Sequence, residues 1–183
     1  MIKLSILIAT IPTRFDVFDK LRMNIHEQIL LHGLEDCIEV LYDASMHYNI
    51  GAKRNRLLLL SNGEYIVFVD DDDLVSHDYI RKVSIACRYG SDCIAINGTI
   101  TFNGTNERQW YISKEYGSWY EKNNIYYRTP NHISPVKREL ALQAGFPEIS
   151  FGEDAEYSRR LLPLLKTEVI INEPIYHYRY VQK

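Results

Sequence analysis

The sequence of 183 residues lacks the features that mark several common protein classes. Its three cysteines, Cys37, Cys87 and Cys93, are odd in number and widely spaced, which predicts reduced thiols in a cytoplasmic protein rather than disulfides or a zinc site. The apolar run at residues 4–9 is too short to span a bilayer, so no transmembrane segment is expected. The formal net charge of -3 argues against a protein that binds nucleic acid through bulk positive charge.

Phosphate-binding glycine motifs and internal repeats are also missing. Neither GxxxxGK[ST] nor GxGxxG follows a predicted strand, so a bound diphosphate would depend on a metal ion and basic side chains. No low-complexity tract or linker interrupts the chain, and its length suits one domain with a sizeable core. We therefore expect a single domain over residues 1–183.

Apolar runs alternate with helical patterns through the first third of the chain. Strands are expected at 3–9, 37–42 and 65–69, separated by helices at 16–33 and 51–61. This order is typical of right-handed βαβ units, and it predicts an α/β fold with a mostly parallel sheet and helices on both faces. Further helices are expected at 77–89, 134–145 and 154–165, strands at 93–102 (with a break at 97–98), 168–171 and 175–180, and irregular loops at 103–130.

Four consecutive carboxylates, Asp70 to Asp73, follow the third predicted strand directly. Because like charges repel, a fold that gathers them normally supplies a cation. If the strand pleat continues into this acidic run, Asp70 and Asp72 lie on the same face and can share one ion. The alternative is a solvated acidic turn in which Asp73 or Ser76 caps the next helix.

Polar residues follow the other two strands as well. Ligands of open parallel sheets bind at the carboxyl ends of the strands, where Thr10 to Arg14 and Asp43 are expected. Asp43 could instead be a turn or helix-capping residue. Lys53 and Arg54 open the second helix, and they could either bind a diphosphate or lie solvated in its first turn.

Five segments in a fixed order carry a resemblance to a known family. ILIATIPTR, LYDAS, IGAKRN, YIVFVDDDD and FGEDAEYSRRL together resemble family 2 glycosyltransferases of the GT-A fold, in a short form similar to bacterial and viral members. The resemblance covers nearly the whole chain. It implies a Rossmann-like GT-A domain, with residues 1–102 as the nucleotide-sugar donor half and residues 103–183 as the acceptor and catalytic half.

The resemblance also implies roles for residues of the donor half. Thr10 and its neighbours up to Arg14 match the loop that holds the donor nucleotide, and Asp43 matches the acid that pairs with the base, whose imide N–H suits UDP. The acidic run matches the DxD motif: Asp70 and Asp71 near the ribose, and Asp72 as the ligand of Mn²⁺ or Mg²⁺.

In the second half, Glu153 and Asp154 match the family's ED motif. Asp154 would be the general base that takes the proton of an acceptor hydroxyl, and Glu153 would orient the acceptor. The alternative is that both acids only favour the start of a helix. His177 could complete the metal shell, or it could be a hydrogen-bonded structural residue. Aromatic residues between 110 and 127 could stack on acceptor sugars, fill a core or line a subunit interface.

The implied function is a metal-dependent inverting glycosyltransferase that moves one sugar from a nucleotide-diphosphate sugar, most simply a UDP-sugar. Neither a QxxRW segment nor C-terminal membrane helices follow the ED motif, which favours single transfer over processive synthesis. Glycans, lipid-linked glycans, proteins and modified bases are all open as acceptors, and acceptor recognition could need a homo-oligomer or a fused domain. Two other hypotheses are a nucleotidyl or phosphoryl transferase and a non-catalytic module that binds metal or nucleotide-sugar.

Overall fold

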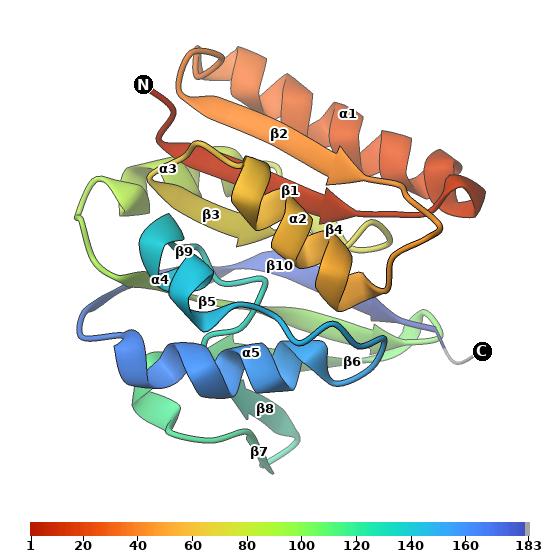
Figure 1. The fold of residues 1–183 in the computed structure, drawn as a ribbon. Coiled ribbons are helices and arrows are strands. Elements are labelled where there is room, and N and C mark those ends of the chain that lie inside the picture. The colour runs from red at the N-terminus through yellow and green to blue at the C-terminus, as the bar shows by residue number, and fades with distance from the viewer. Residues whose placement is uncertain (182–183) are drawn as a thin grey trace.

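Strand β1 (Leu4–Ala9) lies between β2 (Ile38–Asp43) and β3 (Tyr65–Phe68), and all three are parallel. Helices α1 (Phe15–Leu31) and α2 (Ile50–Leu60) make the two crossovers between these strands. β1 and β3 are almost wholly apolar because both faces of the sheet are covered at this point. In the computed structural model, which describes residues 1–181, their carboxyl ends meet at one edge (Figure 1).

The remaining elements extend the same sheet. The sheet order is β2-β1-β3-β9-β5-β6-β8-β7, and β10 joins it beside β5 and β4. The other elements are β4 (Leu74–Val75), α3 (Tyr79–Cys87), β5 (Cys93–Phe102), β6 (Thr105–Ile112), β7 (Tyr120–Lys122), β8 (Ile125–Arg128), β9 (Val136–Lys137), α4 (Arg138–Ala144), α5 (Glu153–Leu161), β10 (Glu168–Tyr180) and the short 3₁₀ turns Pro12–Arg14, Lys114–Tyr116 and Leu162–Leu164.

Two apolar cores lie on opposite faces of the sheet. Alternate residues of β3 separate cleanly: Val67 packs with α1 and α3, whereas Ile66 and Phe68 pack with α2, α4 and α5. The predicted α/β fold with a largely parallel central sheet and helices on both faces is therefore confirmed (Figure 1). Within residues 1–181, no helix is both long and apolar enough to cross a bilayer.

The region 103–130, predicted as irregular loops, instead forms three strands. Asn103 and Gly104 adopt positive φ angles of 51° and 76°, which lets β5 turn directly into the antiparallel β6. β8 then pairs with β6 and with β7, and rings of β7 and β8 stack, with 4.8 Å between the centroids of Tyr120 and Tyr127. The tyrosines that suggested irregular structure are cross-strand pairs.

Two predicted strand breaks are also absent from the structure. β5 runs without interruption through Asn97, whose buried amide donates to the carbonyl oxygens of Ile171 and Asn172. β10 is one long strand with bulges on either side of Pro174, and it pairs in parallel with β5. Local polarity and a proline therefore mark irregularities within strands, not the ends of strands.

Candidate active site

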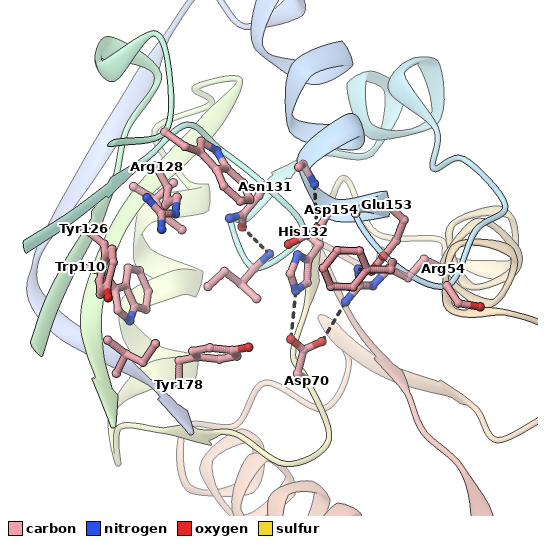
Figure 2. A pocket seen from close by; sticks show the side chains of 18 residues that line it. Arg54, Asp70, Trp110, Tyr126, Arg128, Asn131, His132, Glu153, Asp154 and Tyr178 are labelled. Carbon is pink, nitrogen blue, oxygen red and sulfur yellow. Dashed lines mark hydrogen bonds and ion pairs between the residues drawn. The ribbon is translucent and has the colours of Figure 1, made fainter. Parts of the chain in front are cut away.

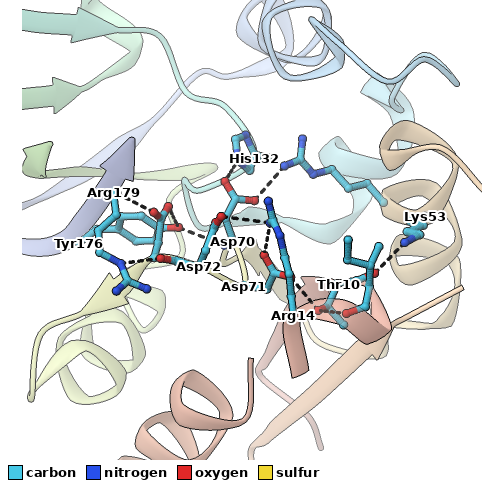
Figure 3. Close-up of polar contacts among 12 residues, drawn as sticks. Thr10, Arg14, Lys53, Asp70, Asp71, Asp72, His132, Tyr176 and Arg179 are labelled. Carbon is cyan, nitrogen blue, oxygen red and sulfur yellow. Dashed lines mark hydrogen bonds and ion pairs between the residues drawn. The ribbon is translucent and has the colours of Figure 1, made fainter. Parts of the chain in front are cut away.

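The acidic run forms a turn, because the strand pleat does not continue into it. β3 ends at Phe68, and the backbone N–H of Asp73 donates to the carbonyl oxygen of Asp70 at 3.2 Å. Asp70 consequently lies beside His132 and Arg54, whereas Asp71 and Asp72 both contact Arg14, at 2.7 Å and 3.1 Å (Figure 3). The strand pleat that would place Asp70 and Asp72 on one face is therefore absent, and a cation shared by these two side chains stays a prediction.

Asp71 links the acidic run to the loop after β1. It is 2% exposed, and its second carboxylate oxygen accepts a hydrogen bond from the Thr10 hydroxyl at 2.7 Å. Lys53 holds the same loop from α2, since its buried ammonium donates to the carbonyl oxygen of Thr10 at 2.7 Å. Burial lowers the pKa of Lys53. Thr10, Arg14, Lys53 and Asp71 thus form one connected unit at the ends of β1 and β3.

Arg54 joins the acidic run to the start of α5. Its guanidinium contacts Asp70 at 3.0 Å and Glu153 at 2.6 Å, and the ring nitrogen Nε2 of His132 lies 3.1 Å from the other oxygen of Asp70. Burial alone would raise the pKa of Asp70, but His132 and Arg54 together hold this pKa well below its usual range. Two acids far apart in sequence, Asp70 and Glu153, are therefore fixed on one buried cation.

Asp73 does not cap the next helix, contrary to one of the expectations. It is buried, and its carboxylate accepts hydrogen bonds from the Tyr176 hydroxyl at 2.8 Å and from the Arg179 backbone N–H at 2.8 Å. The Arg179 side chain in turn donates to the carbonyl oxygen of Asp72 at 2.6 Å (Figure 3). Burial, together with the charge of Asp70, raises the pKa of Asp73 to about 8. The C-terminal strand β10 thus encloses one side of the acidic run.

Asp43 ends β2 beside the Thr10 loop. The backbone N–H of Thr10 donates to its carbonyl oxygen at 3.0 Å. One carboxylate oxygen accepts from the backbone N–H of Ser45 at 2.8 Å, as in an Asx turn, and the other contacts Arg56 at 2.9 Å. The carboxylate therefore shapes the turn after β2 and lies near the loop to which a nucleotide role was assigned.

A pocket of about 590 Å³ opens between the acidic run, the start of α5 and the strands β5, β6 and β8. Figure 2 shows Arg54 and Asp70 on one side and Trp110, Tyr126, Arg128 and Tyr178 on the other. Asp154 lines this pocket and is half-buried. Its Oδ1 accepts from the backbone N–H of Ala155 at 2.8 Å, and among residues 1–181 its Oδ2 has no hydrogen-bond partner. Asp154 is thus available to accept a proton from a group in the pocket.

The metal ligands predicted from the sequence were Asp72 and His177. Within the described chain, no three or more histidine, cysteine, aspartate or glutamate side chains are arranged to hold a metal ion. Asp72 is 42% exposed at its side chain, and burial and the neighbouring carboxylates raise its pKa. The Nδ1 atom of His177 lies 2.6 Å from the Thr99 hydroxyl. Such a donor set suits Mg²⁺ or Mn²⁺ held by one or two carboxylates and by substrate phosphates, because these ions keep few protein ligands.

The sequence did not assign roles to two residues that the structure brings into the pocket, His132 and Arg128. His132 lies between β8 and β9, where no pattern in the sequence indicates a partner for its ring. Arg128 is the last residue of β8, within the region predicted to be irregular. Its position depends on the pairing of β8 with β6, and no local signal in the sequence predicts this pairing.

Comparisons with known proteins agree with this geometry. Residues 25–146, more than half of the chain, match the model of glycosyl transferase family 2. The chain is similar to the glycosyltransferase GlyA of Streptococcus pneumoniae, with 27% identity over 157 residues that cover 76% of this chain. It spans only 22% of the length of that relative.

Solved structures of TarS from Staphylococcus aureus share the fold. TarS residues 1–349 in complex with UDP-GlcNAc match with a TM-score of 0.70 and 15% identity, over 100% of this chain and 60% of that one. The complex of the same fragment with UDP matches with a TM-score of 0.70 over 98% of this chain and 61% of that one. The predicted GT-A fold is thereby confirmed. The family model that matches residues 25–146 shows that this chain belongs to glycosyl transferase family 2.

Proposed function

We propose that this chain transfers a single sugar from a UDP-sugar to an acceptor hydroxyl with inversion at the anomeric carbon, and that Asp154 is the general base. The observation that carries the proposal is the Arg54 bridge, which ties Glu153 of the ED motif to Asp70 of the acidic run. Because of this bridge, Asp154 borders the same pocket as the end of β3. UDP and UDP-GlcNAc complexes of the structurally similar TarS support the choice of donor.

The donor would lie at the ends of β1, β2 and β3. Asp43 would accept the imide N–H of uracil, and Thr10, Asp70 and Asp71 would line the ribose and diphosphate side of the site. Arg14 donates a hydrogen bond to Asp71, and Lys53 donates one to the carbonyl oxygen of Thr10. We therefore assign to both side chains the role of fixing the loop after β1. The pairing of Arg54 with two acids likewise makes it a positioning residue.

Mg²⁺ or Mn²⁺ would be held by Asp72 together with donor phosphate oxygens, and His177 would support this ligand set. The ion, when bound, would neutralise negative charge on the departing diphosphate. Glu153 would help to orient the acceptor. Asp154 would take the proton of the acceptor hydroxyl while that oxygen bonds to the anomeric carbon, and the bond from this carbon to UDP would break on the opposite face.

Residues from both 1–102 and 103–183 line the pocket, which agrees with separate roles for the two parts of the chain. We assign donor binding to residues 1–102 and acceptor binding and catalysis to residues 103–183. Arg54 and Asp70 reach the pocket from the first part, whereas Trp110, Arg128 and Asp154 reach it from the second. The two parts share one sheet, since β10 pairs with both β4 and β5.

The test is Asp154→Asn, which removes the base and keeps the shape of the side chain. UDP release from a panel of UDP-sugars should fall by at least about a hundredfold, the usual contribution of a general base, while UDP and Mn²⁺ binding by calorimetry stay unchanged. Glu156→Gln is the matched control, because Glu156 lies in the same helix turn but pairs with Arg159 and Arg160 outside the pocket. Unchanged turnover of Asp154→Asn, or release of pyrophosphate in place of UDP, would contradict the proposal.

A further inference from the structure

Within the described part of the chain, some charged side chains that line the pocket have ion-pair partners and others do not. Arg54 is ion-paired with both Glu153 and Asp70, so all three of these charged side chains already have partners. This leaves Asp154 and Arg128 as lining residues that, among residues 1–181, have no oppositely charged side chain within ion-pair distance. Asp154 has a role in the proposed chemistry. Arg128 has none so far.

Arg128 is held rigidly by its surroundings. Its guanidinium lies 5.0 Å from the ring centroid of Trp119 and 5.0 Å from that of Tyr126. Its Nη1 donates to the carbonyl oxygens of Tyr127 at 3.1 Å and Tyr120 at 3.3 Å. Two aromatic rings and two carbonyls thus contact this guanidinium, and Figure 2 shows Arg128 beside Tyr126 at the wall of the pocket.

The other edge of this guanidinium remains free. No hydrogen bond within residues 1–181 uses Nε or Nη2 of Arg128, and neither atom is among the buried polar atoms that lack a partner. The neighbouring acid Glu121 is paired with Arg108 at 3.1 Å. Nε and Nη2 form the parallel pair of donors that binds the two oxygens of a phosphate or carboxylate.

We propose that the acceptor carries an anionic group, a phosphate or a carboxylate, and that Arg128 binds this group through Nε and Nη2. This inference rests on the proposed function, because it names the class of acceptor that the pocket takes. Trp110 and Tyr178 supply apolar surface in the same pocket for the sugar or polyol that bears the charge. Arg128 thereby selects the acceptor, and Asp154 activates it.

The test measures binding of small probes without a donor sugar. The chain contains two tryptophans, Trp110 and Trp119, and both line the pocket, so intrinsic fluorescence reports its occupation. Glucose 6-phosphate, glucuronate and glucose are titrated in the presence of saturating UDP. At least one anionic probe should bind at least about tenfold more tightly than glucose, the effect of one charge-assisted hydrogen bond or more. The tighter of the two anions identifies phosphate or carboxylate as the recognised group.

Substitutions assign the preference to Arg128. Arg128→Gln should abolish the preference for anions, and Arg128→Lys should retain only part of it because an ammonium lacks the paired donors. Arg108→Gln is the matched control: Arg108 lies on the neighbouring strand β6, its guanidinium is 5.6 Å from the ring centroid of the same Tyr126, and it does not line the pocket. Urea unfolding of each variant confirms that it is folded.

Three results would overturn the inference. The first is equal binding of glucose and both anions by the unsubstituted chain. The second is an equal loss of anion binding in the variants of Arg128 and Arg108. The third is a weaker affinity for UDP in Arg128→Gln with unchanged anion preference, which would assign Arg128 to the donor. Failure of the proposed function gives a different result, namely absent turnover of UDP-sugars with the Arg128-dependent anion preference intact.

Discussion

Replacement of Arg54 by methionine should destabilise the fold by about 3 kcal/mol. Removing one partner of a buried ion pair costs about 3–5 kcal/mol, because the remaining charge is left in a poorly solvated site. The Glu153 side chain is 9% exposed and would lose its ion-pair partner, whereas Asp70 is 27% exposed and would keep His132. Since only Glu153 is left without compensation, we expect a value at the lower end of that range.

Arg54→Met also removes the contacts of the guanidinium with two aromatic rings, Phe68 at 5.8 Å and Phe146 at 5.5 Å, and this adds to the loss of stability. Methionine keeps much of this packing, so the charge effect should dominate. Urea unfolding followed by tryptophan fluorescence measures the change. With a slope of up to about 3 kcal/mol per molar urea, the midpoint should fall by about 1 M.

A second substitution separates lost charge pairing from lost packing. Adding Glu153→Met to Arg54→Met removes the orphaned carboxylate, so the double variant should be more stable than Arg54→Met alone. Arg56→Met is the matched control in the same helix: the Arg56 side chain is 47% exposed, and its partner Asp43, 10% exposed, keeps the hydrogen bond from the Ser45 N–H. It should cost about 1 kcal/mol, less than Arg54→Met. A loss in Arg54→Met no larger than this control, or a double variant less stable than the single one, would refute the reasoning.

Three further predictions concern the surroundings of the site. Gly98→Ala should lower the unfolding midpoint, because an added methyl group would overlap the backbone of Tyr176 in β10, and differential scanning calorimetry would contradict this reasoning if the unfolding temperature did not change. Burial raises the pKa of Asp92, but hydrogen bonds from the backbone N–H groups of Lys166 and Thr167 and from the Lys137 side chain lower it by more, so its folded pKa lies below the unfolded one. Its stabilisation is therefore complete above pH of about 4 and is lost as pH falls through the folded pKa; the stability gap between the unsubstituted chain and Asp92→Asn in urea titrations should narrow in acid, and a constant gap would count against it. Chelation by EDTA should stop sugar transfer and Mn²⁺ should restore it, with Asp72→Asn needing more Mn²⁺ than the unsubstituted chain; transfer that is insensitive to EDTA would exclude the metal.

The sequence predicts the first part of the fold well because its signals are local. β1 and β3 are apolar runs covered on both faces, and α1 carries a clear apolar stripe, so three parallel strands and their polar ends follow from the order and periodicity of these runs. The polar strand ends at Thr10, Asp43 and Asp70 do meet at one edge of the sheet.

The sequence does not predict which side chains contact the acidic run. The run has equal charges at each position, and only the turn after Phe68 directs Asp71 to Arg14 and Asp73 to Tyr176. These partners come from elements separated by up to about a hundred residues, and their approach depends on strand register and not on any local pattern. For the same reason the sequence does not predict the place of Arg128 in the pocket, because this place is set by the pairing of β8 with β6.

The closure of the acidic run by β10 has a consequence for the order in which the protein matures during synthesis. Residues 1–68 can pair β1, β2 and β3 as soon as they leave the ribosome, but β4 and β5 pair with strands that come later, and Asp73 then lacks the hydroxyl of Tyr176 and the backbone N–H of Arg179. These groups arrive with the last strand, which must insert beside β4 and β5. Contacts of such long sequence separation form slowly. A nascent chain therefore forms the parallel strands β1 to β3 before β10 closes the acidic run, and under the proposed function UDP binding should appear only after β10 has formed.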